Sequence, residues 1–110
     1  MNLYHESFEM IKGGRKDIEL RLYDEKRKTI SVDDVIIFTD IDTGETLKTK
    51  CLKLHKAKTF LELFKTIDDN ERVGSLKTET HEEMSEQMRE YYSKEQEEKY
   101  GVLGIEIVTL

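Results

Sequence analysis

Apolar residues recur along the chain with two different spacings, which together predict a mixture of helices and strands. Tyr4, Phe8 and Ile11 lie about one helical turn apart, which predicts a first helix near the N-terminus. The glycine pair Gly13-Gly14 follows directly, at a position where helices commonly end. The first element is therefore predicted to be a helix that stops at these two glycines.

Strict alternation of apolar and polar residues begins after the glycine pair and predicts a strand over residues 17–23. Successive side chains of a strand point to opposite faces, so Ile18, Leu20 and Leu22 are predicted to share one face and to belong to the core. The other face carries Asp17, Glu19, Arg21 and Tyr23. That face has either a solvent-exposed or a functional role, and alternation alone leaves both open.

The rest of the chain predicts two further strands, three helices and a closing strand. A short buried strand is predicted at 35–38, a hairpin at 40–45, and a long strand over 46–58 whose alternation shifts between Cys51 and Leu52, as at a β-bulge. Capping signatures predict helices over 60–67, from 81 and from 94, with residues 68–80 as a loop. Residues 102–110 read as the last strand. This order predicts an α+β fold, with a small mixed sheet or barrel and helices on its outside.

The charge of the chain is unevenly distributed. Its 110 residues, of which 36% are hydrophobic and 38% charged, carry a net charge of −6. Residues 11–58 hold 12 Lys and Arg against 9 Asp and Glu, a local excess of +3, whereas residues 59–110 hold 6 against 13, a balance of −7. Binding of an anion is therefore expected in the first half, and any contact with nucleic acid should be local and electrostatically modest.

Length and the absence of sorting signals predict one domain over residues 1–110 and a cytoplasmic location. No apolar stretch approaches the roughly 20 residues that span a bilayer, so no membrane partner is expected. The single cysteine, Cys51, excludes an internal disulfide and is predicted to be a small buried residue.

Most common chemical motifs are absent from the sequence. The three histidines have no metal-ligand spacing, and no phosphate-loop, dinucleotide or nucleophile-elbow motif occurs, so neither a metal nor a cofactor is expected. Gly13-Gly14 precedes Arg15 and Lys16, and such a turn can bind an anion through free backbone N–H groups. A plain helix stop is the favoured interpretation of these glycines.

Lys16, Glu19 and Arg21 form the strongest candidate site. A strand places Glu19 and Arg21 on the same face about 7 Å apart by its rise per residue, so that both can contact one ligand. Arg21 is suited to phosphate or carboxylate, Glu19 to an exocyclic amine or to base catalysis, and Lys16 to charge stabilisation or nucleophilic attack. An ordinary surface ion pair fits the same pattern.

A family resemblance favours the functional interpretation. The stretch IKGGRKDIELRLYDEKRKTISVDDVIIF, residues 11–38, resembles the signature of the ASCH family, the activating signal cointegrator homology domains, which reads roughly GxKxxExR followed by a charged turn and a GDxIxF strand. Gly14, Lys16, Glu19 and Arg21 occupy its four positions, while Asp33 stands where the family often has glycine. Residues 58–64 and 91–107 are also similar to family segments, so the resemblance covers nearly the whole chain.

The resemblance implies a pseudouridine-synthase-and-archaeosine-transglycosylase-like (PUA-like) β-barrel with helices on its outside and a cleft beside the signature strand. It also implies that this cleft binds RNA or a modified nucleoside or nucleotide. On this basis the expected ligand-binding residues are Gly14, Lys16, Glu19, Arg21 and Tyr23, with Tyr23 stacking on a base.

Two alternatives remain at this point. One branch of the family resembles amidohydrolases that deacetylate N4-acetylcytidine with a lysine, a threonine three residues later and a distal glutamate. Lys16 matches that lysine and Glu62 is a candidate for the glutamate, but Glu19 replaces the threonine, so Lys16 and Glu19 are the catalytic candidates if the protein is an enzyme. The other alternative is a protein-interaction domain that uses the stripe of Met84, Met88, Tyr91 and Tyr92, although such a stripe more often belongs to a core. The oligomeric state is left open.

Overall fold

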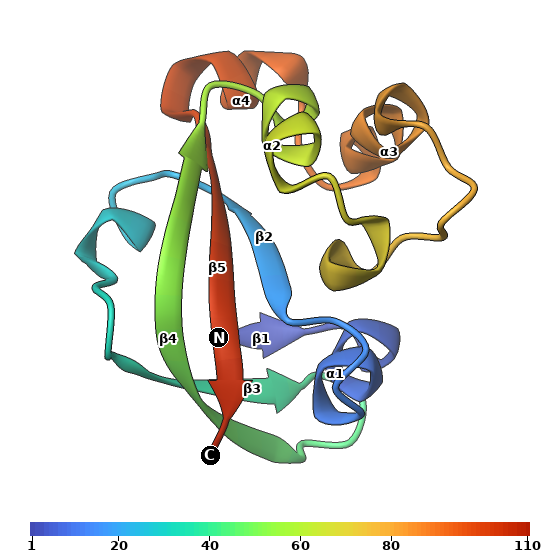
Figure 1. Ribbon diagram of the computed structural model, residues 1–110. Coiled ribbons are helices and arrows are strands. Elements are labelled where there is room, and N and C mark those ends of the chain that lie inside the picture. Colours follow the sequence, from blue (N-terminus) through green and yellow to red (C-terminus); the bar gives the residue numbers. More distant parts are fainter.

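The computed structural model describes residues 1–110 and contains one five-stranded sheet, curled into a half-barrel and surrounded by helices (Figure 1). The strand order is β1-β3-β4-β5-β2. β1 pairs in parallel with β3, and the other neighbours are antiparallel. The strands are β1 (Asn2–Leu3), β2 (Ile18–Leu22), β3 (Val35–Asp40), β4 (Thr46–Ala57) and β5 (Val102–Thr109). The predicted α+β fold class is confirmed, with the barrel left open between β1 and β2.

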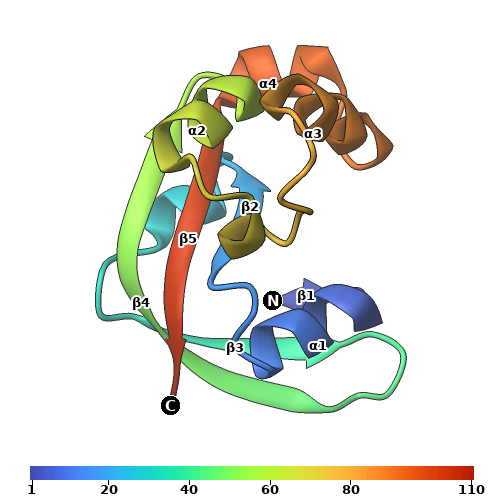
Figure 2. The ribbon, with the colours of Figure 1, turned by 45° about the vertical axis from the view of Figure 1, so that its right-hand side comes forward.

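Four α-helices pack around the sheet, and capping side chains define where three of them begin. They are α1 (His5–Lys12), α2 (Phe60–Ile67), α3 (His81–Gln87) and α4 (Lys94–Tyr100). Thr59 caps α2, and α3 and α4 both have complete capping boxes, as the sequence predicted. Figure 2 shows α2, α3 and α4 gathered at one end of β4 and β5, with α1 near the other end.

Three short 3₁₀ helices complete the chain: η1 (Arg27–Thr29), η2 (Asn70–Val73) and η3 (Met88–Glu90). The helix η2 lies inside the segment that was predicted to be loop. Its Arg72 carbonyl accepts a hydrogen bond from the backbone N–H of Asp17, which ties this segment to the start of β2. No helix combines the length and the apolar character that crossing a bilayer requires.

The sheet has an apolar core on each face. The inner core fills the concave side of the curl and consists of Leu3, Phe8, Ile11, Ile36, Phe38, Cys51, Leu103, Ile105 and Ile107. The outer core lies between the sheet and the helices and consists of Ile18, Leu22, Phe60, Leu63, Phe64, Val73, Met84, Met88 and Val102. β5 contributes to both cores, which explains its nearly continuous apolar sequence.

Several local predictions are confirmed. Cys51 is fully buried, and the register of β4 shifts between Cys51 and Lys53, close to the predicted bulge. Met84 and Met88 are buried in the outer core, so most of the predicted stripe is core rather than a partner surface. Tyr91 departs from the stripe, because 54% of this residue is exposed.

The charged face of β2 points into the half-barrel. Glu19 is paired with Ile105 and Arg21 with Leu103, and directly paired residues project from the same side of a sheet. Both β5 partners belong to the inner core, whereas Ile18 and Leu22 pack under the helices. The alternation was therefore predicted correctly, and the polar face is not an ordinary solvent-facing one.

Asp33 occupies the left-handed region, with φ of 76°. Glycine adopts this conformation without steric cost, which explains why the related pattern has glycine at this position. The turn retains its shape here because Asp33 donates its backbone N–H to the Cys51 carbonyl at 2.8 Å. The exposed Asp33 side chain makes only one ion pair, to Lys50 at 3.4 Å.

Replacing Asp33 by glycine should raise the free energy of unfolding by about 0.5 to 1 kcal/mol. Relief of the left-handed backbone outweighs both the larger entropy of the unfolded chain and the weak surface ion pair. Urea denaturation measures this change. The matched control is Asp34→Gly, which removes the 2.8 Å hydrogen bond from the Ser31 N–H to the Asp34 carboxylate and should destabilise the protein. A loss of stability in both variants would contradict the interpretation.

Candidate functional site

Three ionic side chains meet at the inner face of β2. Glu19 accepts a hydrogen bond from Lys16 Nζ on Oε1 at 2.8 Å and one from Arg21 Nε on Oε2 at 2.9 Å. Lys16 and Glu19 are nearly inaccessible, with 7% of each side chain exposed, whereas 15% of the Arg21 side chain remains exposed. Arg21 is therefore the member of the set through which an outside ligand can be contacted.

The turn before β2 brings Lys16 into this position. Gly14 has φ of 79°, which allows the chain to leave α1 and reverse toward the strand. The backbone N–H groups of Arg15 and Lys16 both donate to the Met10 carbonyl. Gly13 and Gly14 donate to α1 carbonyls in the same way, so no N–H group of this turn is free for an anion. The helix-stop interpretation is confirmed, and Gly14 acts on the site only through the backbone.

A glycine in η2's C-terminal turn makes room for the buried lysine. A Cβ atom on Gly74 would lie 3.1 Å from the Lys16 Cδ atom and 3.3 Å from the Met10 Cε atom. Gly74 also has φ of 89°, so both its backbone conformation and its lack of a side chain are required. The apolar stem of Lys16 thus packs between α1 and η2, while its ammonium group reaches Glu19.

Two cations keep Glu19 ionised. Burial alone raises the pKa of a carboxyl group, but the charges of Lys16 and Arg21, together with their hydrogen bonds, outweigh burial and hold the pKa of Glu19 below its usual range. The site therefore presents a carboxylate whose charge is locally neutralised.

Arg21 also bridges the open seam of the half-barrel. Its Nη2 atom donates to the Asn2 carbonyl at 2.7 Å, which connects the two edge strands β2 and β1. Nε and Nη2 are thus used within the protein, and Nη1 makes no hydrogen bond. Of the guanidinium nitrogens, Nη1 is the one left for a ligand.

Tyrosines from both ends of the chain surround the seam. Tyr92 stacks on Phe60, with ring centroids 5.9 Å apart, and is close enough to Arg21 and Glu19 for their charges to act on its pKa, which burial raises. Tyr4 and Tyr91 meet with ring centroids 6.1 Å apart, and both are more than half exposed. Sequence reasoning assigned Tyr91 and Tyr92 to a helical stripe and missed this contact, because no local signal connects residue 4 with residue 91.

Tyr23, the remaining predicted ligand contact, lies away from Glu19. Its ring packs against the inner core and faces two ammonium groups, Lys56 Nζ at 4.8 Å and Lys28 Nζ at 5.7 Å from the centroid. The structure thus brings Lys16, Glu19 and Arg21 together and places Tyr23 beside a second group of cations.

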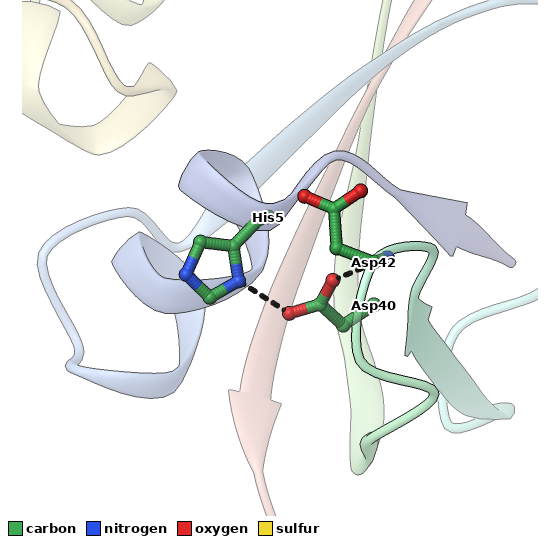
Figure 3. Close-up of side chains that lie close together, drawn as sticks. All are labelled: His5, Asp40 and Asp42. Carbon is green, nitrogen blue, oxygen red and sulfur yellow. Dashed lines mark hydrogen bonds and ion pairs between the residues drawn. The ribbon is translucent and has the colours of Figure 1, made fainter.

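A second ionic cluster, at the start of α1, has the composition of a metal site (Figure 3). His5 Nδ1 lies 2.6 Å from Asp40 Oδ2, and ligand atoms of His5, Asp40 and Asp42 lie within 4.8 Å of one another. Asp40 Oδ1 accepts hydrogen bonds from the backbone N–H groups of Asp42 and Thr43. These hydrogen bonds engage both oxygens of Asp40 and explain the cluster as a turn cap, so we assign no metal to it.

Comparisons with known proteins show the family and the fold of this chain. A family model described as "ASCH domain" matches residues 1–110. The chain belongs to the ASCH domain family. The match spans the complete half-barrel and every residue of the site, and the PUA-like architecture implied by the signature is shown by the fold. Among curated proteins, no match was found.

Two solved structures are similar to this ASCH chain over its whole length. The crystal structure of a hypothetical protein, PH0355, is 39% identical, with a TM-score of 0.86 and coverage of 100% of this chain and 96% of the other. The solution structure of protein PF0455 from Pyrococcus furiosus is 35% identical, with a TM-score of 0.70 and coverage of 100% and 98%. Neither description assigns an activity.

The residues of the amidohydrolase alternative do not form a catalytic arrangement in this ASCH chain. Glu62 is exposed in the first turn of α2, where its carboxylate accepts a hydrogen bond from the backbone N–H of Lys58. Glu19, at the position of the threonine, is bonded to Lys16 and shares a buried ion pair with it. Cys51 is also unsuited to nucleophilic chemistry, because burial raises the pKa of its thiol.

Replacing Glu19 by glutamine should reduce the free energy of unfolding by about 3 kcal/mol or more near neutral pH, because two buried cations lose their counter-charge. Since the folded pKa of Glu19 is lowered, its stabilisation is complete above the ordinary pKa of about 4.3 and is lost as the pH falls through the folded pKa. The difference in the free energy of unfolding between the native protein and the variant should therefore become smaller at acidic pH. Denaturation at several pH values measures it, with Glu25→Gln at the exposed Lys28 pair as control; a loss below 1 kcal/mol would contradict the prediction.

The ion pair between His5 and Asp40 should stop contributing to stability at alkaline pH. The hydrogen bond to Asp40 raises the pKa of His5 above its usual 6.5, so its contribution to stability is complete below that value and disappears as the pH rises through the folded pKa. His5→Gln should therefore lose more stability at pH 6 than at pH 9. A proton NMR titration of His5 checks the direction, and Asp40→Asn should return the His5 pKa toward 6.5; an unchanged value would overturn the assignment.

Proposed function

We propose that this protein binds single-stranded RNA or a nucleotide at the Lys16–Glu19–Arg21 site, without catalysing a reaction there. The observation that carries the proposal is the position of Arg21. Its guanidinium group is fixed by Glu19 and Asn2 at the open seam, and Nη1 remains without a partner. A rigid, partly exposed guanidinium group is well suited to bind phosphate or a base edge.

The three residues have different roles in this proposal. Arg21 contacts the ligand, whereas Glu19 is as buried as Lys16 and acts by fixing the guanidinium group of Arg21 instead of reading a base amine. Lys16 is too buried for the phosphate contact that its charge suggested. It instead pairs with Glu19 and keeps it ionised, so that Glu19 can hold Arg21 in place.

The electrostatics of Glu19 favour binding over deacylation. A general base works best with a pKa near the working pH, whereas Lys16 and Arg21 hold the pKa of Glu19 below its usual range. Lys16 is also committed to an ion pair, which reduces its capacity to stabilise a developing oxyanion. The same contacts that fix the site therefore make it a weak acid–base catalyst.

Replacing Arg21 by lysine should weaken ligand binding by about 1 to 3 kcal/mol while the fold is retained. Lysine keeps the charge, but one ammonium group cannot contact Glu19, Asn2 and a ligand in the geometry of a guanidinium fork. Fluorescence anisotropy with short single-stranded RNAs measures the affinity, and circular dichroism checks the fold. Arg15→Lys is the matched control, since Arg15 is exposed and forms no ion pair; equal losses in both variants would contradict the proposal.

The enzyme alternative makes an opposite prediction that can be tested on the same samples. A binder should release no acetate from N4-acetylcytidine. Release by the native protein that disappears in Lys16→Ala, with the fold intact by circular dichroism, would show that the site is catalytic and that the proposal is wrong.

A further inference from the structure

A second group of cations lies near the opening of the half-barrel, which is the seam between β1 and β2. These cations belong to the turn that follows β2. Figure 1 shows this segment leaving the end of β2, crossing to η1 and then reaching β3. The amino group of Met1 is close enough to Arg21, Lys26 and Arg27 for their charges to lower its pKa, after the larger effect of burial. Positive charge therefore accumulates around the opening, although the whole chain carries a net charge of −6.

β4 adds a further cation on the same face of the sheet. Arg21 and Lys56 are both paired with Leu103, so the three residues form a row across β2, β5 and β4 on the inner face of the sheet. Lys56 is exposed and forms no ion pair, and its ammonium group lies 4.8 Å from the centroid of the Tyr23 ring. The row thus links the Arg21 site to the Tyr23 surroundings.

The turn itself supplies two more cations on the same side. Lys28 Nζ lies 5.7 Å from the Tyr23 ring centroid, and its only ion pair is with the exposed Glu25. Arg27 bonds Asp24 through Nη1, while its buried Nε atom has no hydrogen-bond partner. Both cations are thus paired with carboxylates of the same turn.

The other end of the opening has the opposite charge. The charges of Glu90, Glu6 and Glu19 all act to raise the pKa of Tyr91, in addition to the larger effect of burial. This negative end also has the exposed rings of Tyr4 and Tyr91, on which a base can stack. Lys28 and Lys56 thus lie beside Tyr23, whereas Glu6 and Glu90 lie near Tyr91.

We propose that Lys28 and Lys56 form a phosphate subsite beside Tyr23, so that the ligand is a phosphorylated nucleotide unit whose base points toward Tyr91. This inference rests on the proposed function, and it adds the chemical class of the ligand and its direction. A free nucleoside would leave Lys56, which forms no ion pair, without a counter-charge. If the nucleotide bound in the reverse orientation, its negatively charged phosphate would lie next to the carboxylates of Glu6 and Glu90.

The test compares each of the four ribonucleosides with its 5′-monophosphate by isothermal titration calorimetry. The native protein should bind at least one monophosphate about tenfold or more tightly than the nucleoside. Lys56→Met combined with Lys28→Met should reduce this preference by about fivefold to tenfold and leave the affinity for the nucleoside unchanged. Both lysines are exposed, so the fold should be retained.

Lys53→Met is the matched control for charge. Lys53 is exposed on the same strand but is paired with Glu106, on the opposite face from Lys56, and should leave the preference for phosphate unchanged. A second readout is the salt dependence of binding to a single-stranded hexaribonucleotide, whose slope should become smaller in the double variant and not in Lys53→Met.

Three results would overturn the inference: equal binding of nucleosides and monophosphates, equal loss of both in the double variant, or the same effect from Lys53→Met. If these ligands bind without preference for phosphate but Arg21→Lys still weakens their binding, the proposed phosphate subsite is wrong and the proposed function stands. If neither the monophosphates nor the hexaribonucleotide bind, both the subsite and the proposed function are wrong.

Discussion

The buried carboxylate of Glu19 is the constraint on which the rest of the site depends. An ionised group in an apolar interior is tolerated only when opposite charges and hydrogen bonds compensate its lost hydration, and here Lys16 and Arg21 supply both. The lysine must then come from the turn after α1, and the arginine from the same strand as Glu19. Arg21 in turn contacts Asn2 and so connects the two edges of the sheet. One ionic cluster thus positions a turn, a strand face and the seam of the half-barrel.

The open seam follows from the way the sheet is built. β5 is central and buries side chains on both faces, whereas β1 has only two residues and cannot pair along the length of β2. The gap is covered by side chains instead of backbone hydrogen bonds, among them Arg21 and the Tyr4–Tyr91 contact. Side chains that close a gap can contact a ligand with the same groups, so the binding role proposed for Arg21 is compatible with its structural role.

Sequence patterns predicted the elements well because those signals are local. Capping spacing located the starts of α2, α3 and α4, and the shift in alternation located the bulge in β4. The direction of the charged face of β2 could not be predicted, since a period of two separates the faces without saying which one water reaches. Contacts such as Tyr4 with Tyr91 and His5 with Asp40 join distant segments, and no spacing rule reveals them. Strand alternation and side-chain chemistry made Lys16, Glu19 and Arg21 the candidate site, and a family signature favoured a functional role over an ordinary ion pair.

The same electrostatics also limit the chemistry that this site can support. A carboxylate held by two cations is a dependable hydrogen-bond acceptor, but each interaction that stabilises its ionised form lowers its strength as a base. A threonine at this position would need no such compensation and would free the lysine for chemistry. An ionised Glu19 and a catalytic Lys16 therefore exclude each other, because Glu19 engages the ammonium group that catalysis would need. In this chain the lysine is buried against the carboxylate, so the proposed ligand contacts fall to Arg21 and to the cations around Tyr23.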